Sequence, residues 1–216
     1  MLKLDNFSNY ILDNLSLEIE NKNLIILGSN GSGKTTLAKV LAGLLSDKII
    51  DNKLINYIPT NLDIFDEFMD VDQYLHLSYF NKNINKKEVF ELLEISDLEN
   101  KKVKSLSSGE SQLVLFASAI LHNAKYTILD EPTANLDPQK IKTIFHLIKN
   151  NYILNHKIII THNLNLAYKL GFDIIYLKNG KIDFNGSSKE FFNQKTLDVY
   201  FDTTVQIKDE NIVVDL

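Results

Sequence analysis

A glycine-rich segment placed directly behind an apolar run constrains this chain more than any other feature. The segment GSNGSGKTT, residues 28–36, follows NLIIL, residues 23–27, and contains three of the eight glycines of the chain. It fits the pattern G-x-x-x-x-G-K-[ST], which begins at Gly28 and ends with Lys34 and Thr35. The apolar run predicts a buried strand, and the spacing of apolar residues in KTTLAKVLAGLL predicts a helix. The sequence therefore predicts a strand, a phosphate-binding loop and a helix in direct succession.

Each residue type in this loop has a physical reason to be there. Glycines adopt positive φ easily and bring backbone N–H groups close around a phosphate, and a nest of N–H groups that continues into a helix N-terminus is a preformed anion site. Lys34 adds positive charge near the β- and γ-phosphates of a nucleotide, and the Thr35 hydroxyl is suited to Mg²⁺. The residues predicted to bind the nucleotide are Gly28, Ser29, Asn30, Gly31, Ser32, Gly33, Lys34, Thr35 and Thr36.

Composition limits the other functions that the chain could have. Its 216 residues suit one α/β domain, and its net charge of −5 argues against broad electrostatic binding to nucleic acid or anionic lipid. The chain has no cysteine, which excludes disulfides and thiolate metal sites. The start MLKLDNFSNY has no basic-then-apolar signal segment, and no apolar run approaches the roughly 20 residues of a membrane span. We therefore expect a soluble, intracellular protein whose role at a membrane is peripheral.

Apolar runs and helical spacing alternate along the chain. Residues 15–28 suggest two adjacent strands, and further strands are predicted at residues 54–58, 125–130 and 156–162. Helices are predicted at residues 34–45, 71–94 (with asparagine and lysine breaks at NKNINKK), 109–124, 136–152 and 163–171. A hairpin is predicted around Asn179-Gly180. Strands that alternate with helices favour an α/β fold with a mostly parallel sheet, in a single domain over residues 1–216.

Two acidic residues close the apolar run YTILD and form the second chemical feature of the chain. Asp130 lies at the predicted carboxyl end of a buried strand, next to the strand of the phosphate loop. It suits a Mg²⁺ ligand there, alongside Thr35. Glu131 would then lie at the γ-phosphate and polarise the attacking water as general base. An ordinary strand end that runs into a turn is the alternative, which the neighbouring phosphate loop makes unfavourable.

The segment LSSGES differs in kind from the phosphate loop. Ser107, Ser108 and Gly109 stand at the start of a predicted helix, which gives a second anion site made of backbone and helix dipole, with hydroxyls added. The alternative is a plain helix N-cap, for which serine is well suited. Two phosphate-binding helix ends in one chain suggest either two anions or two copies of the chain facing each other. A cluster of lysines before the segment is interpreted as a solvated face: Lys101, Lys102 and Lys104.

The remaining candidate for phosphate chemistry is His162, which follows a predicted buried strand in IIITHN. It could hydrogen-bond the γ-phosphate or sense it, although a histidine at a strand end is more often structural. Every basic residue of the chain other than histidine is a lysine. A homodimer of this chain therefore cannot supply an arginine finger to a transition state.

Taken in order, these motifs resemble the nucleotide-binding subunit of ATP-binding cassette (ABC) transporters over nearly the whole chain. GSNGSGKTT is similar to the Walker A loop, LSSGE to the signature motif LSGGQ, and YTILDEP to Walker B with its glutamate. ANLD, residues 134–137, is similar to the D-loop, and the TH at His162 to the switch histidine. The signature is the specific element, because other P-loop enzymes lack it. The resemblance implies a P-loop core, a trimmed antiparallel β-subdomain, and a helical insert at about residues 62–108 that carries the signature.

The resemblance also implies how the chain would work. Two subunits would pack head to tail, so that ATP and Mg²⁺ bound by one subunit are covered by the signature helix of the other. Closing this sandwich would move a membrane partner, and hydrolysis would reopen it. The resemblance assigns catalytic roles to Glu131 and His162. It places further residues at the nucleotide across the interface, namely Ser107, Ser108, Gly109, Glu110 and Asp137.

Several positions depart from the family pattern. Tyr10 is expected to stack on the adenine, with Phe7 as the second choice. Thr60, which has a shorter reach, stands where the Q-loop glutamine usually follows the strand. Ser108 replaces a glycine and Glu110 the usual glutamine, and both are mild changes. The segment between residues 45 and 57 is shorter than usual, which is why a trimmed β-subdomain is expected.

Within the family, we expect the ATPase subunit of a membrane transporter, at the cytoplasmic face of the cell membrane. Its expected partners are a second ATP-binding subunit and separate integral-membrane permease subunits, with no nucleic acid. We expect the second ATP-binding subunit to be a copy of this chain, with a related chain as the alternative. The tail GSSKEFFNQKTLDVYFDTTVQI resembles importer subunits for iron-siderophore, haem or cobalamin uptake, and cobalt or nickel uptake or export stay open. The alternatives are a soluble ABC ATPase acting on nucleic acid or ribosomes, and a small-molecule kinase. The first would call for a coiled-coil insert or a second cassette, and the second would leave LSSGE unexplained.

Overall fold

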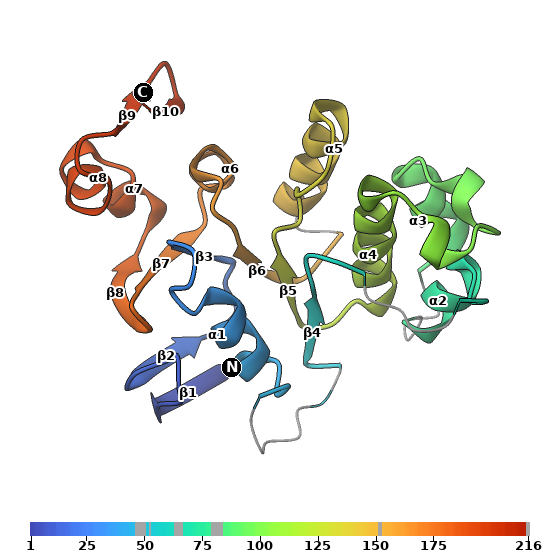
Figure 1. Ribbon diagram of the computed structural model, residues 1–216, viewed down its shortest axis with the longest axis horizontal. Helices are drawn as coiled ribbons and strands as arrows, with labels where there is room; N and C mark the ends of the chain where they lie inside the picture. The colour runs from blue at the N-terminus through green and yellow to red at the C-terminus, as the bar shows by residue number, and fades with distance from the viewer. Residues whose placement is uncertain (46–50, 52, 63–66, 79–83, 151–152, 215–216) are drawn as a thin grey trace. The chain divides into compact units, whose positions relative to one another are not determined.

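The computed structural model describes residues 1–45, 51, 53–62, 67–78, 84–150 and 153–214. The chain divides into two compact units. We call residues 1–45 together with 158–216 the terminal unit, and residues 46–157 the central unit. Figure 1 shows the elements of both, and each unit is described by itself below.

The sheet of the terminal unit is built around β3 (Leu24–Gly28). β3 pairs in parallel with β6 (His156–Ile160), whose first two residues belong to the central unit, and with β7 (Asp173–Lys178). β7 pairs antiparallel with β8 (Lys181–Gly186). Leu24, Ile25 and Ile26 are fully buried. A continuous apolar run of this kind is typical of a parallel strand covered on both faces, as predicted.

The turns and helix ends of this unit follow the positions of glycine. α1 (Lys34–Leu41) ends before the predicted residue 45, because Gly43 has φ 75° and closes the helix. α6 (Leu164–Leu170) is closed by Gly171 at φ 71°, as predicted. The predicted hairpin is confirmed: Asn179 and Gly180, with φ 49° and 75°, form the tight turn between β7 and β8.

A second, small sheet in the terminal unit pairs β1 (Leu2–Phe7) with β2 (Leu15–Ile19) in antiparallel fashion. Leu15, Leu17 and Ile19 are buried and alternate with exposed residues, as expected for a half-buried strand. The sequence predicted β2 and β3 but not β1, and β2 pairs with β1 rather than with β3. This sheet confirms the expected small antiparallel element.

The C-terminal region has four elements that the sequence did not predict. They are α7 (Ser188–Phe191), α8 (Gln194–Phe201), β9 (Val205–Lys208) and β10 (Asn211–Val214). The ring of Phe191, which is fully buried, stacks with the rings of Tyr176 and Tyr200, and these two tyrosine rings contact each other in a tilted arrangement. The β9–β10 hairpin is attached to α6, because the amide of Asn165 exchanges two hydrogen bonds with the backbone of Ile212.

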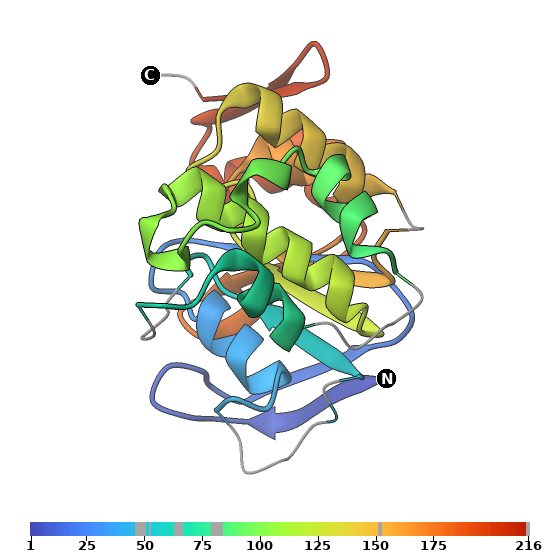
Figure 2. The ribbon, with the colours of Figure 1, turned by 90° about the vertical axis from the view of Figure 1, so that its right-hand side faces the viewer.

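In the central unit, β4 (Ile55–Ile58) pairs in parallel with β5 (Tyr126–Asp130). The longest helix, α4 (Ser108–His122), contacts β4, α2 (Val71–Leu77) and α3 (Lys86–Leu92). Figure 2 shows α2 and α3 beside α4. Residues 112–121 of α4 are all buried, which is typical of a helix covered on every side. The parallel strands and the helices between them confirm the predicted α/β class.

The remaining elements of this unit are helices and short 3₁₀ turns, whose bounds differ in part from those predicted. The helical region predicted at 71–94 contains two helices, α2 and α3. Asp70 caps α2, and Asn85, which lies within the predicted break NKNINKK, caps α3. Two short 3₁₀ turns follow, at Ser96–Leu98 and Val103–Ser105. α5 (Pro138–Lys149) occupies most of the predicted helix at 136–152, of which residues 151 and 152 lie outside the described residues. The extent of the helical insert, about residues 62–108, stays a prediction.

Across the described ranges, no helix is both long enough and apolar enough to cross a membrane.

Candidate nucleotide-binding site

The phosphate loop has the tight geometry that its glycines predict. Gly28 ends β3 with φ 151°, and a Cβ atom there would lie 2.4 Å from the carbonyl oxygen of Leu177. Gly33 caps α1 with φ 100°, and a Cβ there would lie 2.8 Å from Cδ2 of Leu12. The positive φ favours glycine at both positions, and at Gly28 a backbone oxygen also leaves no room for a Cβ.

The side chain of Lys34 folds back over this loop. Its ammonium donates hydrogen bonds of 2.8 Å to the carbonyl oxygens of Gly28 and Ser29, and the residue is only 9% exposed. The hydroxyl of Ser32 is buried and has no hydrogen-bond partner among the described residues. A buried ammonium and an unpartnered hydroxyl inside a glycine loop fit the oxygens of a phosphate. Other loop residues are exposed, namely Ser29, Asn30, Gly31 and Thr35, and Thr36 is partly exposed.

The turn that carries Tyr10 lies directly against the phosphate loop. The carboxamide oxygen of Asn9 accepts hydrogen bonds from the backbone N–H groups of Ile11 and Leu12, at 2.9 and 2.7 Å. A Cβ on Gly33 would lie 3.0 Å from Cγ2 of Ile11, so the two segments are in close contact. Tyr10 itself is 85% exposed. An exposed ring beside a phosphate loop is well placed to stack on a base, whereas Phe7 is half-buried at the end of β1.

His162 lies at the same edge of the terminal unit as the phosphate loop. β6 runs parallel to β3, and the N–H of Thr161 donates to the carbonyl oxygen of Ile26 at 3.3 Å. Because the carboxyl ends of parallel strands meet at one edge, the residues after β6 lie near the loop after β3. His162 is exposed, and the next residue, Asn163, caps α6. The phosphate loop, Tyr10 and His162 are thus brought together in this unit.

In the central unit, Asp130 ends the buried strand β5, as predicted. The predicted position of this strand next to the strand of the phosphate loop is wrong, because the neighbours of β5 are β4 and β6. The sequence analysis also missed a partner of Asp130. Asp130 is 3% exposed, and its Oδ2 accepts a 3.0 Å hydrogen bond from the hydroxyl of Tyr57 in β4. Burial and the neighbouring carboxylate raise the pKa of Tyr57 well above its usual value, so the tyrosine stays a neutral donor. Thr60 follows β4 by two residues and lies at the same edge as Asp130, because Ile58 is opposite Leu129.

Glu131 has a backbone conformation that is rare for its residue type. Its φ is 50°, and its carbonyl oxygen accepts a hydrogen bond from Ala134 N–H at 3.0 Å. Such strain in a residue other than glycine is typical of functional sites. The turn continues through Asn135, with φ 61°, to Asp137. The carboxylate of Asp137 caps α5 by accepting hydrogen bonds from the N–H groups of residues 139 and 140. Its predicted contact with a nucleotide across a dimer stays a prediction.

The segment LSSGE forms a capped helix end. The hydroxyl of Ser107 accepts from Glu110 N–H at 3.3 Å, and the carboxylate of Glu110 accepts from Ser107 N–H at 2.8 Å. Ser107 is therefore a helix N-cap, which was one of the two interpretations of this segment. Ser107 and Ser108 are also exposed, and the other interpretation, an anion site, stays a prediction. A Cβ on Gly109 would lie 3.1 Å from the carbonyl oxygen of Asn135. The signature-like helix end therefore packs against the loop of residues 134–137.

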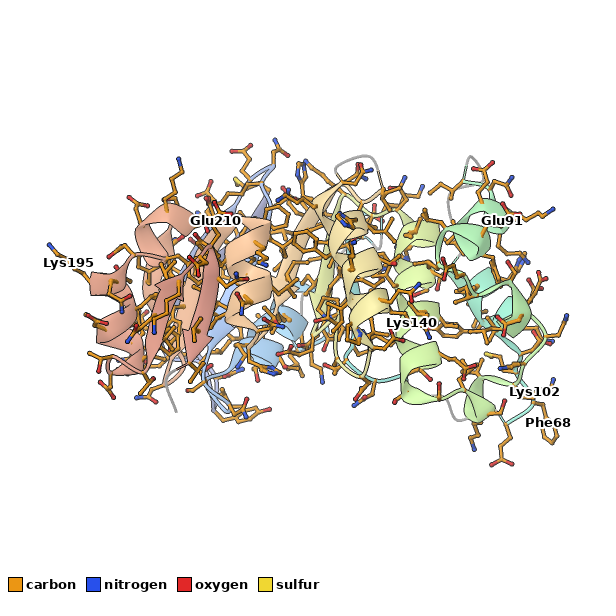
Figure 3. All side chains as sticks on the ribbon, turned by 90° about the horizontal axis from the view of Figure 1, so that it is seen from above. Phe68, Glu91, Lys102, Lys140, Lys195 and Glu210 are labelled. Atoms are coloured by element: carbon orange, nitrogen blue, oxygen red, sulfur yellow. The ribbon has the colours of Figure 1, made fainter. Side chains whose placement is uncertain are left out.

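The lysine cluster before this helix is exposed, as predicted, but each lysine also has a partner. Lys101 pairs with Glu110 at 2.8 Å, and Lys104 pairs with Glu67. Lys102 donates to the carbonyl oxygen of Phe68 at 2.6 Å, and Figure 3 shows these two residues together at the surface. The hydrogen bonds from Lys101 and Ser107 lower the pKa of Glu110 to about 2.

Comparison with known proteins decides the family. The family model described as ABC transporter matches residues 12–134. The chain belongs to the ABC transporter ATP-binding family. It is 33% identical to the energy-coupling factor transporter ATP-binding protein EcfA1 of Thermotoga maritima, over 88% of this chain and 81% of that protein. It is 34% identical to the molybdate/tungstate import ATP-binding protein WtpC of Methanocaldococcus jannaschii, over 84% of this chain and 69% of that protein.

The fold of this ABC protein agrees with solved structures. The dimeric structure of MJ0796, a bacterial ABC transporter cassette, covers 87% of the chain at a TM-score of 0.74, and the chain covers 99% of it. At 24% sequence identity this likeness concerns the fold alone. The predicted resemblance to ABC transporter ATP-binding subunits is confirmed.

Proposed function

We propose that this chain binds and hydrolyses Mg²⁺-ATP and thereby powers a membrane transporter, with two copies packed head to tail. The observation that carries the proposal is that each of the two units contains one backbone segment suited to binding an anion. The terminal unit has a glycine loop with Lys34 folded across it, and the central unit has an exposed, serine-capped helix end. One chain thus carries both halves of a phosphate site, and a second copy supplies the complement to each.

Binding would begin at the phosphate loop. The ammonium of Lys34 would exchange its two backbone acceptors, Gly28 and Ser29, for phosphate oxygens, which accept more strongly because they are charged. Thr35 and Asp130 are the proposed holders of Mg²⁺, which supplies positive charge to the β- and γ-phosphates when bound. Tyr10 would stack on the adenine from the adjoining turn.

Hydrolysis would use residues on both sides of the γ-phosphate. Glu131 would accept a proton from the attacking water as the new P–O bond forms and the bond to ADP breaks. His162 would donate a hydrogen bond to a γ-phosphate oxygen. Because the chain has no arginine, Lys34 and the partner's α4 helix end would oppose the remaining charge. Closing would be driven by ATP, since ATP contacts both copies only in the closed dimer.

Import is the direction that the relatives favour. The names of EcfA1 and WtpC describe an energy-coupling factor transporter and molybdate/tungstate import. We propose that this chain serves an importer with separate permease subunits, at the cytoplasmic face of the cell membrane. The cargo we propose is a metal ion or a metal-containing compound, such as an iron chelate, haem or cobalamin. The tail resemblance noted in the sequence supports this class.

Phosphate release by the purified chain tests the ATPase proposal. We expect Mg²⁺-dependent release by the unaltered chain. We also expect Lys34→Ala to weaken ATP affinity roughly 10- to 100-fold, because the loop loses its one ammonium. Lys39→Ala, in the same helix but outside the loop, is the matched control and should bind ATP normally. Equal ATP affinities of Lys34→Ala and the unaltered chain in titration calorimetry would refute the phosphate-loop assignment.

Co-purification tests the transport proposal. The tagged chain, expressed with the genes beside its own, should carry an integral-membrane protein through purification. ATP hydrolysis by that complex should respond to the cargo. Stimulation by ribosomes or nucleic acid, with no membrane protein retained, would instead support the soluble alternative.

A further inference from the structure

We propose that Lys101 is a charge-compensating residue of the nucleotide site. Its ammonium neutralises the carboxylate of Glu110, so that the start of α4 stays attractive to the triphosphate of a partner copy. The proposal rests on the proposed function, because it concerns the helix end that would cover ATP.

The carboxylate of Glu110 is fixed at this helix end. One of its oxygens accepts from the backbone N–H of Ser107, and the other accepts from the ammonium of Lys101, each at 2.8 Å. The side chain of Glu110 is only 24% exposed. These two hydrogen bonds hold the negative charge of Glu110 at the start of α4, where a phosphate would approach.

The position of Lys101 is fixed as well. Its backbone N–H donates to the carbonyl oxygen of Leu98 at 2.9 Å, and its own carbonyl oxygen accepts from Val71 N–H at 3.0 Å. The backbone of Lys101 is therefore tied to both the 3₁₀ turn and α2. The ammonium reaches Glu110 from an anchored position rather than from a free loop.

The ion pair of Lys101 and Glu110 determines the sign of the charge at the start of α4. A helix N-terminus carries roughly half a positive charge, and a full negative charge on Glu110 would reverse its sign. The ammonium of Lys101 restores a net positive charge of about one half at the place where the γ-phosphate would arrive. A neutral glutamine at residue 110 would keep the capping contact with Ser107 and would need no compensation. The requirement for Lys101 therefore follows from the presence of Glu110.

The test is a pair of substitutions in two backgrounds. Lys101→Met removes the charge and keeps most of the side-chain length. In the unaltered background it should raise the ATP concentration for half-maximal phosphate release roughly three- to tenfold, with a smaller effect on kcat. In a Glu110→Gln background the same substitution should have no effect. Lys101→Arg should behave like the unaltered chain, and high salt should shrink the effect of Lys101→Met.

Lys104→Met is the matched control, because Lys104 is as exposed as Lys101 but pairs with Glu67, which is not a residue of α4. It should leave half-saturation unchanged. An equal rise for Lys101→Met in both backgrounds would overturn the proposal, because a purely structural role does not depend on the charge of Glu110. No rise in either background would overturn it too. If the unaltered chain neither binds nor hydrolyses ATP, the proposed function fails first and this inference falls with it.

Discussion

The hydroxyl of Tyr57 donates a hydrogen bond to Asp130, the residue proposed to hold Mg²⁺. Tyr57→Phe keeps the ring in place and removes only that hydroxyl. We expect the free energy of unfolding to fall by about 1 kcal/mol, because the carboxylate of Asp130 loses one donor in a buried place. Urea unfolding monitored by circular dichroism measures this change. Identical midpoints for the two proteins would mean that water replaces the hydroxyl without cost.

Glu131 combines a strained backbone with the proposed role of general base. Glu131→Gln keeps the size and hydrogen-bonding shape but cannot accept the proton of water. We expect phosphate release to fall about 100- to 10,000-fold while ATP binding is retained. The matched control is Glu94→Gln, because Glu94 is exposed and also has a positive φ, of 55°. Normal phosphate release by Glu131→Gln would remove the general-base assignment.

The sequence predicts the functional residues that belong to short, continuous motifs. The phosphate loop could be predicted because its residues are consecutive, and the Ser107–Glu110 cap because S-x-x-E is a local pattern. The contact of Tyr57 with Asp130 joins residues 73 positions apart. The apolar pattern of one strand does not indicate which side chains of the neighbouring strand lie opposite. The contact of Tyr57 with Asp130 could therefore be found only from the register of β4 against β5.

Among the elements, α5 depends on the cap that Asp137 provides. Asp137→Ala should lower the free energy of unfolding by about 1 kcal/mol, because two helix N–H groups lose their acceptor. Asp137→Asn should retain most of that stability, since asparagine caps almost as well. If Asp137→Asn nevertheless weakens ATP-dependent dimerisation, the aspartate also acts across the interface. Full activity of Asp137→Asn would leave capping as its only role.

The other end of α5 is closed by a buried lysine. Lys157, in β6, is fully buried, and its ammonium donates to the carbonyl oxygens of Asn150 and Leu154 at 3.3 and 3.2 Å. Burial lowers the pKa of Lys157 from 10.5 to about 8. Above about pH 8 the folded chain has therefore released a proton that the unfolded chain still binds. Stability must rise with pH through this window.

The Lys157→Met variant isolates this effect. The free energy of unfolding of the unaltered chain, minus that of Lys157→Met, should increase as the pH rises from about 8 to 10.5 and then level off. Urea unfolding at a series of pH values measures the difference. A difference that does not change with pH would contradict a lowered pKa in the folded state.

Long elements with strong periodicity were predicted well, and short ones were not. α4 and β3 follow their apolar patterns closely. β1 was missed because its apolar alternation covers only Leu2 and Leu4, and the register shifts between Leu4 and Phe7. The β9–β10 hairpin was missed because its turn, Asp209-Glu210, contains no glycine or asparagine, although both residues have positive φ.

For the whole molecule, the order of strands and helices along the chain was enough to predict an α/β fold with parallel pairing. The division into two compact units was not predicted, because both units contribute strands and no linker composition separates them. The phosphate loop and the signature-like helix α4 belong to different units. In the proposed dimer, the phosphate loop of one copy faces the start of α4 of the other copy.

A cross-link between two copies tests this central claim most directly, because the chain has no cysteine of its own. Asn30→Cys in the phosphate loop and Ser108→Cys at the start of α4 are made in separate Glu131→Gln chains, both at exposed positions. The two chains are mixed with Mg²⁺-ATP and a short thiol cross-linker. The account predicts a cross-linked dimer in the mixture with Mg²⁺-ATP, and none without nucleotide or with either chain alone. No cross-link in the mixture, at any protein concentration, would contradict the head-to-tail sandwich.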